Sequence, residues 1–359
     1  MNTQQIKAIV MQPNLMTITL AVALALMLVF VLMAGQSVLI PVAIAVLLWF
    51  VINALSNALR NTIRPGSHVM PGWAGLLAAL LIVIAVVIGL AEVVASSGLA
   101  MLDRLPQYTE NLSALSEKLS LLLGFEIMSQ IASAIDGLDF EAVILAFTDG
   151  AASLLGNIGT VILYVAFLLV EQQFMPMKLD AIAGTEKRGA EIRRVMDDIS
   201  RRIRTYLFTK SLTSAAMAGV VWIFLLIVGV DFAGFWALLV FILNFIPVVG
   251  GIVSGVFPAL LALVQFPTFG PFMIVVAGVA TAHLIIGNVV EPRFVGSSVN
   301  LSPLVVILAL AIWGLIWGIP GMFLCIPLTV IAMIIFAEFD STRPIAIALS
   351  ENGELGQVK

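Results

Sequence analysis

The sequence NFIPVVGG (244–251) interrupts one long apolar stretch, and IWGIPGMFLCIP (316–327) interrupts a second. A charged segment, GNVVEPRFVG (287–296), lies between them. The hydrocarbon core of a membrane cannot hydrogen-bond a loose N–H or C=O, so a broken helix at that depth must pack on protein or line a water-filled cavity. Paired Gly/Pro interruptions in corresponding apolar segments are a sequence sign of a secondary transporter's substrate site. We therefore predict that these breaks shape a site inside a membrane protein.

The composition of the whole chain also indicates a membrane protein. Hydrophobic residues make up 61% of the 359 residues and charged residues only 11%, whereas roughly a quarter of residues are charged in soluble domains. The predicted fold class is an all-α polytopic membrane protein with about eight transmembrane segments, each near the length that spans a bilayer. We place these segments at 15–34, 37–58, 72–96, 151–170, 211–229, 234–265, 271–290 and 302–336, the sixth and eighth being broken.

The distribution of Lys and Arg predicts the orientation, because short cytoplasmic loops are rich in them. Loop 59–71 and segment 171–208 are basic, whereas 97–150 has two basic and eight acidic residues. Both chain ends are then cytoplasmic. The predicted divisions are 1–96 (N-terminal transmembrane helices), 97–150 (acidic helical extracytoplasmic segment), 151–170 (transmembrane helix), 171–208 (cytoplasmic basic amphipathic segment on membrane lipids), 211–336 (transport core with broken helices) and 337–359 (cytoplasmic tail).

The broken segments 234–265 and 302–336 can be threaded in two ways. If each is a single span, the chain crosses the membrane eight times. If each folds back at its Gly/Pro tip, the two become re-entrant hairpins that enter from opposite sides, and six full crossings remain. Each half of 234–265 has about 12–15 residues, which is short for a full span. This length favours the opposed hairpins.

The tips of the two breaks supply groups that can bind a solute or an ion. Glycine lets the backbone approach a ligand closely, and proline leaves a helix carbonyl without its usual donor. Asn244 adds a neutral side chain with both a donor and an acceptor. The predicted tip residues are Asn244, Pro247, Gly250, Gly251, Gly318, Pro320 and Gly321. The alternative is that the glycines and prolines only kink helices for packing.

The charged segment between the breaks contributes Asn288, Glu291 and Arg293. Ionisable residues at the membrane edge are costly and mark functional sites by default. Glu291 and Arg293 either form a salt bridge that locks the following loop, or Glu291 exchanges a proton or binds a cation beside Arg293. His283 could relay a proton, although a hydrogen bond to a neighbouring helix is the favoured explanation.

Several function classes do not fit the sequence. It has no GxxxxGK[ST] loop for ATP, and the membrane segments contain no HExxH or aspartate pair that a protease would need. One cysteine allows no thiolate metal cluster within the chain, and the net charge of −4 argues against nucleic acid. We therefore predict a protein that is not an enzyme and uses no cofactor or metal. Its ligand would be a small polar solute or a monovalent cation, and a channel or a non-transporting membrane scaffold stays as the alternative.

Together the motifs NFIPVVGG, GNVVEPRFVG and WGIPGMFLCIPLTVI, with LPQY at 105–108, resemble the autoinducer-2 exporter (AI-2E) family of permeases. The resemblance covers about residues 15 to 350. It implies a bacterial inner-membrane homo-oligomer that exports an autoinducer-2-type signal, with sodium(lithium)/proton antiport as the alternative. Because the polar residues concentrate at the two breaks and the charged segment, and do not line a continuous pore, we expect a carrier that works by alternating access. The family's motif positions here are Asn244, Pro247, Gly250, Asn288, Glu291, Pro292, Arg293, Gly318 and Gly321.

Overall fold

The computed structural model describes residues 15–62, 71–123, 158–291 and 299–355. Within these ranges the chain is helical, and its only strand-like pairing is an isolated bridge between Leu301 and Ser350. The helices are α2 (Leu15–Ala34), α3 (Gln36–Thr62), α4 (Gly72–Leu123), an unlabelled helix Ile158–Glu171, α7 (Met175–Ala183), α8 (Glu186–Val228), α9 (Ala233–Leu243), α10 (Val249–Gln265), α11 (Gly270–Ile285), the π-helix η1 (Ile286–Val290), α13 (Pro303–Ala337) and α14 (Arg343–Leu349). The predicted all-α polytopic fold class is confirmed.

Five of the described helices are long and apolar enough to cross a membrane. A sixth span results if the helix Ile158–Glu171 and α7, which meet at 66°, are counted together. Side chains on these helices leave large apolar areas exposed, for example Ile227 at 78% and Leu315 at 81%. Such a surface suits contact with lipid, which cannot satisfy polar groups. The predicted count of eight spans stays a prediction.

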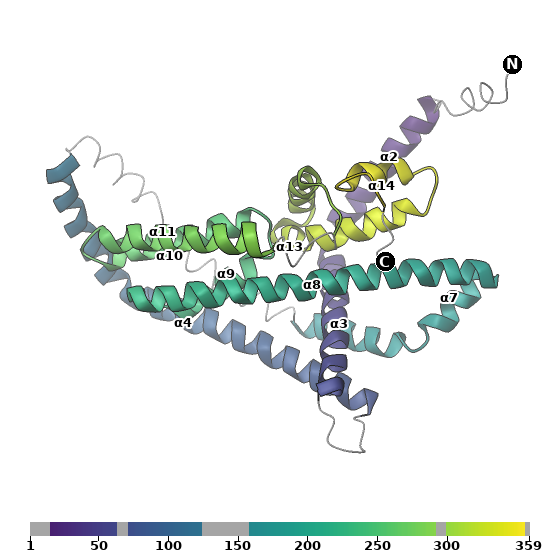
Figure 1. The fold of residues 1–359 in the computed structure, drawn as a ribbon, viewed down its shortest axis with the longest axis horizontal. Helices are drawn as coiled ribbons and strands as arrows, with labels where there is room; N and C mark the ends of the chain where they lie inside the picture. The colour runs from purple at the N-terminus through teal and green to yellow at the C-terminus, as the bar shows by residue number, and fades with distance from the viewer. Residues whose placement is uncertain (1–14, 63–70, 124–157, 292–298, 356–359) are drawn as a thin grey trace.

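Helix α8 forms the long axis of the molecule (Figure 1). It begins after Thr185, whose side chain accepts a hydrogen bond from the Arg188 N–H, and ends at Gly229 with φ 82°. Its first part packs in one apolar core through Ile203 and its last part in another through Leu225. From Glu186 onward, the basic amphipathic segment and the fifth predicted span are thus one continuous helix, whereas residues 172–185 belong to α7 and the turns on either side of it.

Helix α4 likewise continues from the third predicted span into the acidic segment without a break. Near its far end, Arg104 and Tyr108 both contact the Asp231 carboxylate, at 2.5 and 3.0 Å. Asn111 donates to the backbone carbonyl of Gln265 at 2.8 Å. These contacts fasten α4 to the turn before α9 and to the end of α10.

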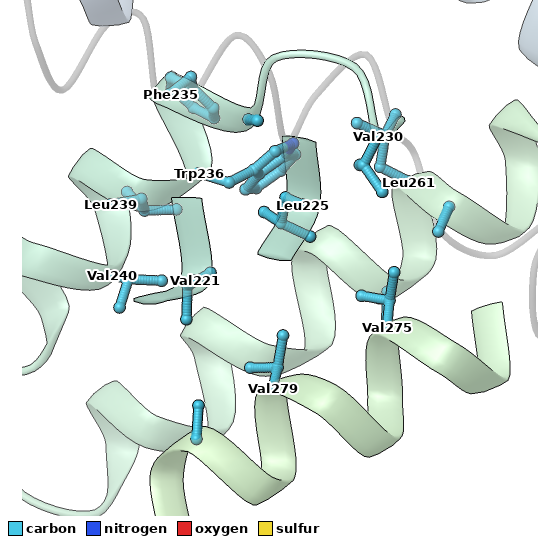
Figure 2. Packing of buried hydrophobic residues seen from close by; sticks show 14 of the residues in the cluster. Val221, Leu225, Val230, Phe235, Trp236, Leu239, Val240, Leu261, Val275 and Val279 are labelled. Atoms are coloured by element: carbon cyan, nitrogen blue, oxygen red, sulfur yellow. The ribbon is translucent and has the colours of Figure 1, made fainter. Parts of the chain in front are cut away.

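The first interrupted stretch folds back as a hairpin of α9 and α10. Gln265, at the end of α10, donates to the Gly229 carbonyl (2.8 Å) and accepts from the Asp231 N–H (2.7 Å), so the two ends of the hairpin lie together. Figure 2 shows how its side chains pack with those of α8 and α11. The labelled residues are Val221, Leu225, Val230, Phe235, Trp236, Leu239, Val240, Leu261, Val275 and Val279.

The second interrupted stretch, α13, also folds back. Its break is Gly318, with φ 63° and ψ −141°, a conformation essentially restricted to glycine. The Trp313 indole N–H donates to the Thr329 hydroxyl at 3.2 Å across a separation of 16 residues. In a straight helix those residues would lie about 24 Å apart. Both breaks are therefore helical hairpins, and their entry from opposite sides of a membrane remains a prediction.

A glycine makes the close contact in each hairpin. A Cβ on Gly250 would lie 1.8 Å from the Leu243 carbonyl oxygen, and one on Gly321 would lie 2.0 Å from the Trp313 carbonyl oxygen. In both hairpins the second arm starts directly against the last carbonyls of the first arm. No residue with a Cβ fits there without moving the backbone.

Candidate functional site

A polar cavity of about 500 Å³ lies at the tip of the α9–α10 hairpin. Its walls come from α8, the hairpin tip, the end of α11 with η1, the start of α13 and the segment after α14. The lining residues are Tyr206, Lys210, Asn244, Ile246, Pro247, Val248, Gly251, His283, Gly287, Asn288, Glu291, Val299, Asn300, Leu301, Val306, Ile326 and Glu351. Segments that are far apart in the sequence thus meet around one volume.

The cavity brings together most residues predicted from the first break and the charged segment. These are Asn244, Pro247, Gly251, His283, Asn288 and Glu291. Gly250 instead packs under the tip, against Leu243. The second tip, with Gly318, Pro320 and Gly321, contributes no lining residue to this cavity, although Val306 and Ile326 of its arms do. Arg293 lies outside the described residues.

Lys210 and Glu291 form an ion pair in the cavity wall, with 2.5 Å between Nζ and Oε1. The Lys210 side chain is 7% exposed and that of Glu291 is 24% exposed. Removing one partner of a buried ion pair costs about 3–5 kcal/mol, because the other charge is left uncompensated. The ion pair also shows that, among the described residues, the partner of Glu291 is Lys210 on α8, which the sequence analysis did not single out. The sequence feature that could have identified Lys210 is its position directly before a long apolar run.

Two hydrogen bonds fix the neutral side chains of the site. Asn244 Nδ2 donates to Ser214 Oγ at 2.9 Å, which joins the hairpin tip to α8. Ser254 Oγ on α10 lies 3.0 Å from His283 Nε2 on α11. The His283 contact agrees with the bond to a neighbouring helix that the sequence analysis considered, and the proton relay stays a prediction.

The hairpin tip has an unusual backbone. Val248 has φ 63° and ψ −58°, and the Val249 N–H donates to the Pro247 carbonyl at 2.6 Å, which makes a γ-turn with a positive φ. This turn is rare and strained, especially for a β-branched residue. Local strain of about 1–3 kcal/mol is characteristic of functional and moving segments.

The opposite wall is irregular as well, because the π-helix η1 separates α11 from Glu291. Single π-turns inside helices frequently occur at functional sites. Gly287 and Asn288 of this turn line the cavity together with Glu291.

Tyr206 on α8, within the segment 171–208 that the sequence predicts to lie on membrane lipids, supplies a further polar group. Its side chain is 3% exposed, it lines the cavity, and its hydroxyl has no hydrogen-bond partner among the described residues. Buried hydroxyls are usually paired. The Tyr206 hydroxyl is therefore a hydrogen-bond donor beside the cavity that has no acceptor among the described residues.

An apolar groove of about 410 Å³ between α10 and α11 continues from the polar cavity. The two volumes share Val248, Gly251 and His283. Within the described ranges, no group of three or more His, Cys, Asp or Glu side chains is placed to hold a metal ion.

Comparison with known proteins agrees with these motifs. The sequence model of the family described as "AI-2E family transporter" matches residues 8–340. The chain is 32% identical over 277 residues to "AI-2 transport protein TqsA" of Escherichia coli (strain K12), covering 76% of this chain and 78% of that protein. It is 30% identical over 265 residues to "Putative transport protein YhhT" of the same strain, covering 72% and 74%.

Proposed function

This chain belongs to the AI-2E transporter family, and on that basis we propose that it is a secondary transporter that exports a small polar solute of the autoinducer-2 type by alternating access. The observation that carries the proposal is the polar cavity at the tip of the α9–α10 hairpin, with the Lys210–Glu291 ion pair in its wall. Autoinducer-2 comes from the printed name of the E. coli relative.

The size and chemistry of the cavity suit such a solute. Small-molecule sites typically measure about 300–1,000 Å³ and hold a few placed polar groups. Here Asn244, Asn288 and Tyr206 can donate hydrogen bonds, and the asparagines can also accept them. Because Lys210 and Glu291 neutralise each other, this part of the wall suits a neutral polar molecule.

The hairpin is the proposed moving element. Its base is fastened to α4 through Asp231 and Gln265, whereas its tip is strained at Val248. Movement of the tip would open and close the cavity, and the neighbouring ion pair would hold α8 against the end of η1 in the closed state. The hinge is then the γ-turn, because rearranging a turn that is already strained costs little conformational free energy.

The rest of the molecule supplies the setting for this movement. We propose a location in the bacterial inner membrane, with both chain ends in the cytoplasm and the exposed apolar helix faces against lipid. We further propose that copies of the chain assemble as a homo-oligomer. The two hairpins would enter the membrane from opposite sides.

The test is autoinducer-2 flux in proteoliposomes, with and without imposed proton and sodium gradients. The proposal expects flux in the wild type and a loss of about tenfold in Asn244→Ala, since a buried hydrogen-bonded group contributes roughly 1–3 kcal/mol. Asn53→Ala is the matched control, because among the described residues the Asn53 amide bonds to the Trp49 carbonyl of its own helix and to no part of the cavity. Cation exchange without autoinducer-2 flux would contradict the proposal and indicate an antiporter.

A further inference from the structure

We propose that Glu351 determines the charge selectivity of the cavity mouth, and that the C-terminal strap, residues 350–355, forms the wall that carries it. The inference rests on the proposed function in taking the polar cavity as the solute site. The experiment measures how fast charged reagents reach a cysteine in the cavity, and it does not depend on transport.

The C-terminal strap is fixed against the residues that lead into α13. Leu301 and Ser350 form an antiparallel bridge, and the Ser302 N–H donates to the Leu349 carbonyl at 3.1 Å. Asn300 Nδ2 donates to the Glu354 carbonyl at 2.7 Å. The strap therefore has a defined position, with several independent contacts that hold it there.

The internal contacts of the strap add to this rigidity. The Gly353 N–H donates to Ser350 Oγ at 3.0 Å, and the Glu354 N–H donates to Asn352 Oδ1 at 3.0 Å. Leu355 packs against the apolar core that α3, α8 and α13 share. A segment held at both ends and along its length can serve as a wall.

This wall separates two cavities of different charge. Glu351 lines the polar cavity, whereas Leu355 lines a second cavity of about 550 Å³ whose charged lining residues are Arg194, Arg201, Arg202, Arg343, Asp198, Glu338 and Asp340. Asp198 pairs with Arg201 and Arg202, and Glu338 pairs with Arg194. Asn300 lines both cavities. The C-terminal strap thus stands between the solute site and a cluster of largely ion-paired charged residues.

Glu351 gives the polar cavity its net charge. Among the described lining residues, the other two with an acidic or basic side chain of opposite sign, Lys210 and Glu291, are paired with each other at 2.5 Å. Glu351 is exposed and takes part in no ion pair that the described residues form. A carboxylate at the mouth that no described residue pairs with attracts cations and repels anions. Solutes that are neutral or cationic would therefore enter more readily than anionic ones.

The test uses a single cysteine in the cavity, Val306→Cys in a Cys325→Ala background, in protein purified in detergent so that both faces are accessible. The probes are a cationic and an anionic methanethiosulfonate reagent at low ionic strength, where charge effects are least screened. One unit charge at about 8 Å in watery surroundings changes each rate roughly twofold in opposite directions. Glu351→Gln should then lower the cation-to-anion rate ratio about fourfold, and Glu351→Lys should lower it further.

Glu354→Gln is the matched control, because Glu354 has the same charge on the same strap but does not line the cavity. It should change the ratio less than about twofold. Removal of residues 350–359 should lower the ratio at least as much as Glu351→Gln, since it removes the Glu351 carboxylate itself. Equal effects of Glu351→Gln and Glu354→Gln, no effect of either, or no reaction of the cysteine with either reagent would overturn the inference. Because labelling requires no flux, a failure of the transport proposal would be seen separately.

Discussion

Replacing Gly250 by alanine should disrupt the α9–α10 hairpin more than any neighbouring glycine substitution. The new Cβ would lie 1.8 Å from the Leu243 carbonyl oxygen and 2.6 Å from its carbon, and both atoms belong to the backbone. A backbone atom cannot rotate away as a side chain would, so the two arms of the hairpin must separate. Gly255→Ala is the control on the same helix, because its nearest neighbour would be Val279 Cγ1 at an ordinary 3.6 Å.

The magnitude follows from two opposing effects. Overpacking typically costs about 1–3 kcal/mol, and the short distance places Gly250→Ala near the upper end. Alanine in place of a helical glycine stabilises by about 0.5–1 kcal/mol. The expected net change in the free energy of unfolding is therefore a loss of about 2 kcal/mol for Gly250→Ala and a gain of about 0.5–1 kcal/mol for Gly255→Ala.

Thermal unfolding of the purified protein measures both changes. With an unfolding entropy of about 2 cal/mol/K per residue, each kcal/mol moves the melting temperature of this chain by roughly 1–1.5 °C. Gly250→Ala should melt about 3 °C below the wild type and Gly255→Ala about 1 °C above it. Equal melting temperatures for the two variants would refute the close contact at the tip.

The two hairpins give further predictions of the same kind. Gly318→Ala should lower the free energy of unfolding by about 1–3 kcal/mol. The cause would be the backbone conformation alone, because an added Cβ meets no atom within 4 Å. A melting temperature equal to that of the wild type would argue against the break. Val248→Gly should relieve strain and raise the melting temperature, with a gain of about 1 kcal/mol, while slowing autoinducer-2 flux if the strained turn is the hinge. Unchanged melting and unchanged flux in Val248→Gly would show that the γ-turn is neither strained nor used.

Sequence reasoning located the hairpins because their signal is local. Glycine and proline in an apolar run act on their own backbone, so NFIPVVGG and WGIPG mark the breaks without knowledge of any neighbour. Asn288 and Glu291 were found for a similar reason, since a polar side chain at the end of an apolar helix is conspicuous by itself.

The remaining parts of the site depend on contacts between distant segments. From the sequence alone, Lys210 looks like the last residue of a basic helix. Its membership of the cavity depends on its contact with Glu291, which lies 81 residues later in the chain. Tyr206 and Glu351 likewise reach the cavity through packing that no local pattern encodes. The second tip is the opposite case, because Gly318 has a clear local signal but does not line this cavity.

The most direct test of the central claim exchanges the charges of the ion pair in the cavity wall. Autoinducer-2 flux in proteoliposomes would be compared for the wild type, Lys210→Glu, Glu291→Lys and the double exchange. Each single reversal places like charges in contact at a site where Lys210 is 7% exposed, so flux should fall about tenfold or more. The double exchange restores opposite charges and should recover flux to within about threefold of the wild type. Wild-type flux in both single variants would contradict the proposed site.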